Sequence, residues 1–145
     1  MSAAAMGRDH YDAMEGFYDT APIHRTLGLK LQVPGDGEAV IVFDGSPGST
    51  NRRGDAAGGA IAQMIDSAVV QAARTRLGHT DSTVTIELKV NYIRAAPAKL
   101  NLRAIGKLDH FGRSTAVGSA RVEDEAGKLY ALGIVTVSIK KAEAA

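Results

Sequence analysis

The spacing of hydrophobic residues changes along the chain and predicts first a helix, then two strands. Between residues 9 and 18, aromatic residues and a methionine recur at helical spacing. Alternating residues then predict strands over 27–33 and 38–43, joined by the turn Pro34-Gly35-Asp36-Gly37. Pro22 predicts an extended or turn-like segment before the first strand.

Residues 57 to about 77 form a long, nearly uncharged helical pattern. Gly78 is the predicted C-terminal cap, and the polar residues 45–54 form the loop before the helix. A helix that is apolar on so many sides should be largely enclosed. Its predicted stripe consists of Ile61, Ile65, Ala68, Ala72 and Arg76, flanked by Met64 and Val69.

The rest of the chain is strand-like, beginning with a regular alternation over 83–92 in which Val84, Ile86, Leu88, Val90 and Tyr92 share one face. Further strands are predicted over 99–108, 113–123 and 128–139. This order predicts an α+β fold in which a curved antiparallel sheet of six strands wraps around one buried helix. Open sheet edges favour association, so we expect a homodimer or a dimer of dimers.

Length and composition favour a single domain over residues 1–145 that is large enough to bury a core. Residues 1–20 form its predicted N-terminal helical segment and residues 140–145 a flexible tail. The formal net charge of +1 gives no reason to expect nucleic acid or an anionic membrane as partner. Neither a secretory signal nor a membrane-spanning segment is recognisable, so a cytoplasmic protein is expected.

Asp66 is the most informative single residue, because it lies mid-helix among apolar neighbours, where a buried charge is costly. Either a buried donor pairs with it, Gln63 and Ser67 being the local candidates, or its carboxylate has a chemical role. Gly58 and Gly59 open the same helix. They either form a tight loop-to-helix turn or expose unsatisfied amides to a ligand.

Other common chemistries lack their motifs. The chain has no cysteine, and its four histidines show no ligand spacing, so no metal is expected. The lysine-containing phosphate loop, the Gly-x-Gly-x-x-Gly fingerprint and the Gly-x-Ser-x-Gly elbow do not occur. We therefore expect no metal or redox cofactor.

Several motifs follow one another in a fixed order along the chain. They are Asn51, Gly58-Gly59, Asp66, Asn91-Tyr92-Ile93-Arg94-Ala95-Ala96-Pro97, Gly112-Arg113-Ser114-Thr115 and the closing segment 122–131. Together they make the chain resemble the hotdog-fold acyl-CoA thioesterases of the phenylacetyl-CoA and 4-hydroxybenzoyl-CoA type. The resemblance covers residues 21 to 139 and implies a long central helix wrapped by a curved sheet.

The resemblance implies a catalytic role for Asp66, as general base or as nucleophile, acting across a dimer interface on the glycine turn of the partner subunit. Gly58 and Gly59 would polarise the thioester carbonyl. Asn51 and Thr85 would position water or substrate, although Asn51 also suits an ordinary turn and Thr85 an ordinary strand face.

Coenzyme A would enter as part of the substrate, with Arg94, His110 and Arg113 near its phosphates; exposed basic residues on loops are the alternative. In one position the chain departs from the family, which usually has a histidine directly before the glycine pair, where Ala57 stands here.

The function expected is hydrolysis of an aryl- or medium-chain acyl-CoA to free acid and coenzyme A. The alternatives are a binding protein that holds acyl-CoA without hydrolysing it, and a hydratase or dehydratase on the same fold. The last needs a histidine beside an acidic residue, and none lies near the helix start.

Overall fold

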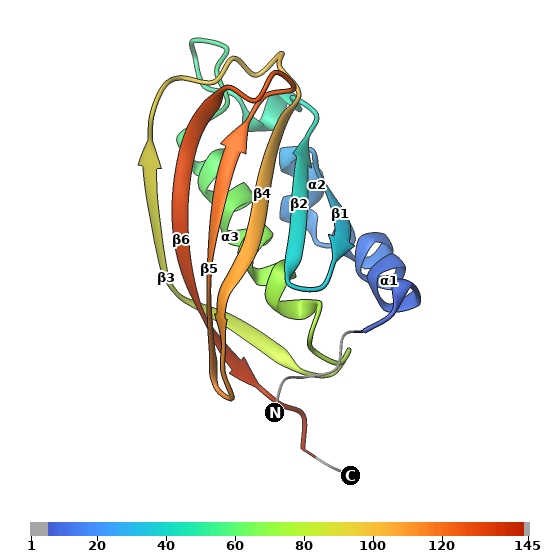
Figure 1. The fold of residues 1–145 in the computed structure, drawn as a ribbon. Helices are drawn as coiled ribbons and strands as arrows, with labels where there is room; N and C mark the ends of the chain where they lie inside the picture. Colours follow the sequence, from blue (N-terminus) through green and yellow to red (C-terminus); the bar gives the residue numbers. More distant parts are fainter. Residues whose placement is uncertain (1–5, 144–145) are drawn as a thin grey trace.

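A long helix lies against the concave face of a curved six-stranded antiparallel sheet (Figure 1). The computed structural model describes residues 6–143 of the chain. The predicted α+β architecture is confirmed. The first five residues of the predicted N-terminal segment and residues 144–145 of the predicted tail lie outside the described part. Lys140, the first residue of that tail, is the last residue of the final strand. The elements are α1 (Arg8–Tyr18), α2 (Pro22–Leu27), β1 (Leu29–Gly35), β2 (Glu38–Phe43), the 3-10 turn η1 (Pro47–Ser49), α3 (Gly58–Arg74), β3 (Ser82–Tyr92), β4 (Leu102–Phe111), β5 (Thr115–Glu123) and β6 (Leu129–Lys140).

The core lies between α3 and the sheet, whose strands run in the order β1-β2-β4-β5-β6-β3. Ile61, Met64 and Ile65 of α3 are almost completely buried. Glycines in the sheet let the helix approach closely: a Cβ at Gly106 would lie 2.7 Å from the Ala68 backbone, and one at Gly133 would lie 2.5 Å from Ile65. The predicted enclosure of this helix is therefore correct.

Several predicted boundaries differ from the structure. The strand predicted over 27–33 is found at Leu29–Gly35, and the strand predicted over 99–108 is found at Leu102–Phe111. The long helix ends at Arg74 with Thr75 as its C-cap, so Gly78 does not cap it. Pro22 does not precede an extended segment but begins the short helix α2. A proline is favoured at the first helical position because its missing N–H would be unpaired there in any case.

β3 forms one edge of the sheet and pairs only with β6 within the described residues. A bulge interrupts this pairing between Thr85 and Glu87, which reverses the faces of the strand. Thr85 therefore pairs with buried Val137 and points toward α3, whereas Val84 and Ile86 are 68% and 61% exposed. The regular alternation predicted over 83–92 is wrong at this point, because a bulge inserts one extra residue.

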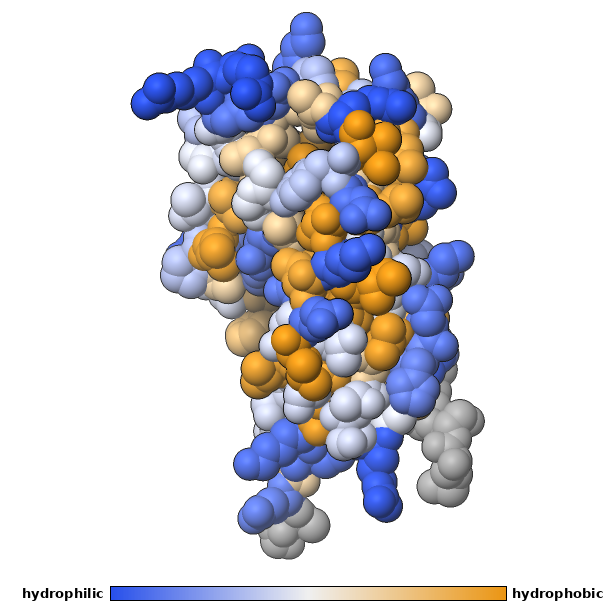
Figure 2. Space-filling model, turned by 90° about the vertical axis from the view of Figure 1, so that its left-hand side faces the viewer, coloured by the Kyte–Doolittle hydropathy of each residue, from blue (hydrophilic) through white to orange (hydrophobic). Residues whose placement is uncertain are grey.

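The exposed side chains of β3 continue into an apolar band along this edge of the molecule. Figure 2 looks onto the β3 side and shows hydrophobic residues interrupted by a few polar ones. Leu132 and Ile134 of the neighbouring strand β6 are also exposed.

Among the helices of the described chain, none has the length and apolar character to cross a membrane.

Candidate functional site

The Asp66 carboxylate lies in the middle of α3 and is held by β3. It accepts a 2.7 Å hydrogen bond from the Thr85 hydroxyl. The bulge in β3 makes this contact possible, because it turns Thr85 toward the helix. The carboxylate is half-buried, so it combines partial desolvation with one fixed donor.

The two local donors considered for Asp66 bind each other instead. Gln63 donates its side-chain amide to the Ser67 hydroxyl at 3.1 Å, and neither residue forms a hydrogen bond to Asp66 in the described structure. Asp66 is therefore paired with a donor, but this donor is Thr85 of β3 and neither of the two local candidates. The Asp66 carboxylate keeps acceptor capacity for a water molecule or a substrate, since one hydrogen bond satisfies only part of it.

Tyr18 brings the N-terminal helices to the same part of α3. Burial raises the pKa of Tyr18 to about 12, the nearby Asp66 carboxylate adds to this rise, and the nearby Ser67 hydroxyl opposes it. The phenol oxygen is buried and forms no hydrogen bond within residues 6–143. The proximity of Tyr18 to Asp66 arises from the fold, since the two residues lie on helices far apart in the sequence.

Gly58 and Gly59 begin α3 and line an open cleft of about 550 Å³. Neither N–H donates a hydrogen bond within the described residues, as expected for the first turn of a helix. Neither glycine has a positive φ, and a Cβ at Gly59 would meet nothing within 4 Å. The backbone conformation of this turn therefore does not require glycine at either position.

Tyr92, at the end of β3, fixes the glycine turn from the side. Its hydroxyl donates a 2.6 Å hydrogen bond to the Gly58 carbonyl, and its ring lines the same cleft. Its position in the alternating strand gave no sign of this role, because the contact depends on where β3 ends relative to the start of α3.

Asn51 shapes the loop that leads into the glycine turn. Its side-chain oxygen accepts hydrogen bonds from the backbone N–H groups of Arg53 and Asp55 at 2.9 and 3.1 Å. This contact matches the turn residue that the sequence allowed as an alternative. Asn51 also lines the cleft, where its side-chain NH₂ is the group left to bind a ligand.

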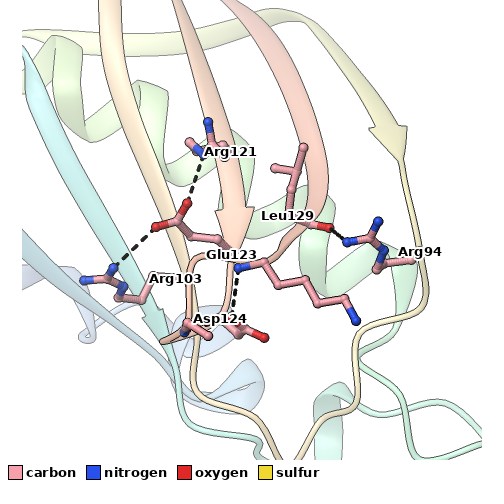
Figure 3. Close-up of polar contacts among 8 residues, drawn as sticks. Arg94, Arg103, Arg121, Glu123, Asp124 and Leu129 are labelled. Atoms are coloured by element: carbon pink, nitrogen blue, oxygen red, sulfur yellow. Dashed lines mark hydrogen bonds and ion pairs between the residues drawn. The ribbon is translucent and has the colours of Figure 1, made fainter.

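The three basic residues expected near coenzyme A do not lie together within one chain. Arg94 lines the cleft and donates a 2.8 Å hydrogen bond to the Leu129 carbonyl (Figure 3). His110 and Arg113 lie at the β4–β5 hairpin, where Phe111 pairs with Ala116 and Thr115 pairs with Ser138. Ser138 in turn pairs with Val84 near the start of β3, so this hairpin is at the opposite end of the sheet from Arg94.

Asp66 and the glycine turn are also separated within one chain. Gly58 and Asp66 are eight positions apart in α3, which corresponds to about 12 Å along a helix. A general base has to reach the reacting group directly or through one water molecule. The residues therefore form two half-sites, one around Asp66 and Thr85 and one around Gly58 and Gly59.

Comparison with known families identifies the fold. The model of the thioesterase superfamily matches residues 53–131, more than half of the chain. The chain belongs to this superfamily. The match includes both half-sites, and no curated protein matches the chain. Groups of three or more metal-binding side chains do not occur among the described residues.

Solved structures give the same assignment. A mutant of the phenylacetic acid degradation protein PaaI from Thermus thermophilus is 32% identical, with a TM-score of 0.71 over 81% of this chain and 97% of that one. A mutant thioesterase from Pseudomonas aeruginosa is 17% identical, with a TM-score of 0.83 over 95% and 99%. The PaaI protein of E. coli is 19% identical, with a TM-score of 0.77 over 93% and 92%. The last two similarities show the hotdog fold alone.

Proposed function

We propose that the chain is an acyl-CoA thioesterase that hydrolyses an aryl- or medium-chain acyl-CoA to the free acid and coenzyme A. The observation that carries the proposal is the Asp66 carboxylate, held by Thr85 with acceptor capacity to spare. Membership of the thioesterase superfamily and the likeness to PaaI support the reaction class.

Each half-site supplies one part of the chemistry. The amides of Gly58 and Gly59 lie at the positive end of the α3 dipole and suit a carbonyl oxygen that becomes negative in the transition state. Asp66 either takes a proton from the attacking water or attacks the carbonyl carbon itself to give an anhydride, which water then hydrolyses. In both cases the thiolate of coenzyme A leaves and is protonated.

A second copy of the chain completes the site. Thr85 and Tyr92 lie on the same strand about 23 Å apart, one bonded to Asp66 and the other to Gly58. If two β3 edges pair antiparallel about a two-fold axis, the Thr85 end of one strand meets the Tyr92 end of the other. Asp66 of one subunit then lies near the glycine turn of its partner.

The β3 edge has the features of such an interface. It is an eleven-residue edge strand with exposed Val84 and Ile86, which would favour aggregation if it stayed unpaired. The same pairing brings the His110 and Arg113 hairpin of one subunit to the end where Arg94 of the other lies. The three basic residues proposed to bind coenzyme A phosphates can thus meet across the dimer.

Non-hydrolytic binding of acyl-CoA is the second candidate function, because of Ala57. Ala57 is the N-cap of α3 and provides no side-chain hydrogen bond there, so the contribution of the family histidine is missing. The glycine amides do not depend on that side chain, and a binding protein gains nothing from the half-buried Asp66 carboxylate. Hydrolysis is therefore favoured.

The proposal is tested by measuring thiol release from aromatic and aliphatic acyl-CoAs, with wild type beside Asp66→Asn. We expect hydrolysis by the wild type alone, and the best acyl chain identifies the substrate. Tight acyl-CoA binding without thiol release from any substrate would identify a binding protein.

A further inference from the structure

A second cavity, of about 380 Å³, lies beside the C-terminal half of α3 and is formed with the N-terminal helices α1 and α2. Tyr18 connects it to the reaction centre, because the residue lines the cavity and lies near Asp66. Its size is that of a small-molecule pocket. If the proposed function is correct, this is the space available to the acyl group.

The walls of this cavity combine apolar and basic side chains. Met14, Phe17 and Tyr18 are the large apolar residues, with His24 stacked on Tyr18 and His79 edge-on to Phe17. Arg74 and three histidines are the basic residues, and the lining contains no carboxylate. The full lining is His10, Ala13, Met14, Phe17, Tyr18, Thr20, Ala21, His24, Gln71, Arg74 and His79.

The Arg74 guanidinium has no anionic partner in the described structure. Its Nη1 atom donates to the Asp81 backbone carbonyl at 3.1 Å, and no carboxylate forms an ion pair with it. The Asp81 carboxylate instead accepts hydrogen bonds from the N–H groups of Gly78 and Ala142 and pairs with Lys141. A half-buried guanidinium with free donors is suited to a carboxylate ligand.

The distance between Asp66 and Arg74 along α3 sets the length of an acyl chain that could reach from one residue to the other. Asp66 and Arg74 are eight residues apart, or about 12 Å along the helix axis. The guanidinium is held by the Asp81 carbonyl, in the segment between α3 and β3, so it does not reach back toward Asp66. This distance suits a medium-length acyl chain that extends through the cavity.

We propose that this cavity binds acyl groups that end in a carboxylate, with Arg74 as the residue that recognises it. The preferred substrate class is then the mono-CoA thioester of a dicarboxylic acid. Apolar Met14 and Phe17 contact the methylene chain, and the Arg74 guanidinium binds the terminal carboxylate.

Binding to Asp66→Asn, which keeps the substrate intact during a titration, tests this proposal. We would compare adipyl-CoA with hexanoyl-CoA, which has the same chain length and a methyl end, by calorimetry. We expect adipyl-CoA to bind about tenfold more tightly or better, as for a charged hydrogen bond. Arg74→Gln in the same background should remove this preference and leave hexanoyl-CoA affinity unchanged, which also shows that the variant is folded.

Two further variants serve as controls. Arg74→Lys keeps the charge and should retain part of the preference, which guards against a folding defect in Arg74→Gln. Arg25→Gln makes the same charge change on exposed α2, outside the lining, and should leave the preference intact. Equal binding of the two thioesters, or a preference that survives Arg74→Gln, would overturn the proposal.

Thiol release from both thioesters by the wild type separates this inference from the proposed function. Hydrolysis of hexanoyl-CoA alone would support the thioesterase and overturn the carboxylate preference. Without any thiol release the hydrolytic function fails, and the affinity ratio still decides whether Arg74 recognises a carboxylate.

Discussion

The Thr85 hydroxyl donates a 2.7 Å hydrogen bond to the Asp66 carboxylate, joining the edge strand β3 to the middle of the long helix α3. A helix places Asp66 near the sheet, but a bulge is needed to turn Thr85 toward it. This pair is therefore built by two separate elements, and it is the part of the molecule on which the proposed reaction depends most.

Removing the Asp66 carboxylate tests its role in the chemistry. We expect Asp66→Ala to lower turnover by about two to four orders of magnitude, as for loss of a general base. The fold and the dimer should persist, because the side chain is half-buried and lies outside the core. Thiol-release kinetics together with light scattering measures both effects, and unchanged turnover would remove Asp66 from the mechanism.

Thr85→Val removes the donor to Asp66 with little change of shape. Hydrogen bonds to charged groups contribute about 1.5–3 kcal/mol, so kcat should fall about tenfold to a hundredfold while KM changes little. Thr85→Ser keeps the hydroxyl and should retain most activity. Thr83→Val, on the same face two residues earlier, is the matched control and should leave kcat unchanged.

Gly59→Ala should separate stability from activity. The backbone has no positive φ here and a Cβ meets nothing within the chain, so alanine should stabilise the helix by up to about 1 kcal/mol. Turnover should fall at least about tenfold, because the methyl group obstructs access to the amide. Gly16→Ala, at an exposed position of α1, is the control, where thermal unfolding should show the gain in stability without loss of turnover.

Tyr18 makes stability depend on pH at the alkaline end. Its folded pKa of about 12 exceeds the ordinary value of 10.0, so its contribution is fully present below pH 10 and is lost as the pH rises toward 12. Relative to Tyr18→Phe, the wild type should lose about 2–3 kcal/mol of unfolding free energy over this range. Urea unfolding at several pH values measures the difference, and parallel curves for both proteins would contradict it.

The sequence predicts the elements of the fold well where the pattern is long and regular. The strand Glu38–Phe43 is found with its predicted bounds. Ile61, Ile65, Ala68 and Ala72 of the predicted stripe are buried in α3, whereas Arg76 lies beyond the end of this helix. The prediction is wrong where local chemistry competes with a general rule. Pro22 begins a helix, and α3 ends before Gly78 because Thr75 forms the cap.

The candidate site could be predicted only in part, because its residues meet through tertiary structure. Asp66, Gly58 and Gly59 stand out by residue type alone. The bond from Thr85 requires a bulge that interrupts the alternating pattern, and the bond from Tyr92 to Gly58 requires the end of β3 to lie beside the start of α3. The separation of Arg94 from His110 and Arg113 follows from strand order, which no local pattern contains.

The most direct test of the composite site is complementation between two inactive variants, Asp66→Asn and Gly59→Val. Each homodimer lacks one half of every site. After unfolding together and refolding as an equal mixture, half of the dimers contain one chain of each kind, and each mixed dimer has one intact site. We expect recovery of about a quarter of wild-type thiol release. A mixture as inactive as the two separate variants would contradict a site shared between two subunits.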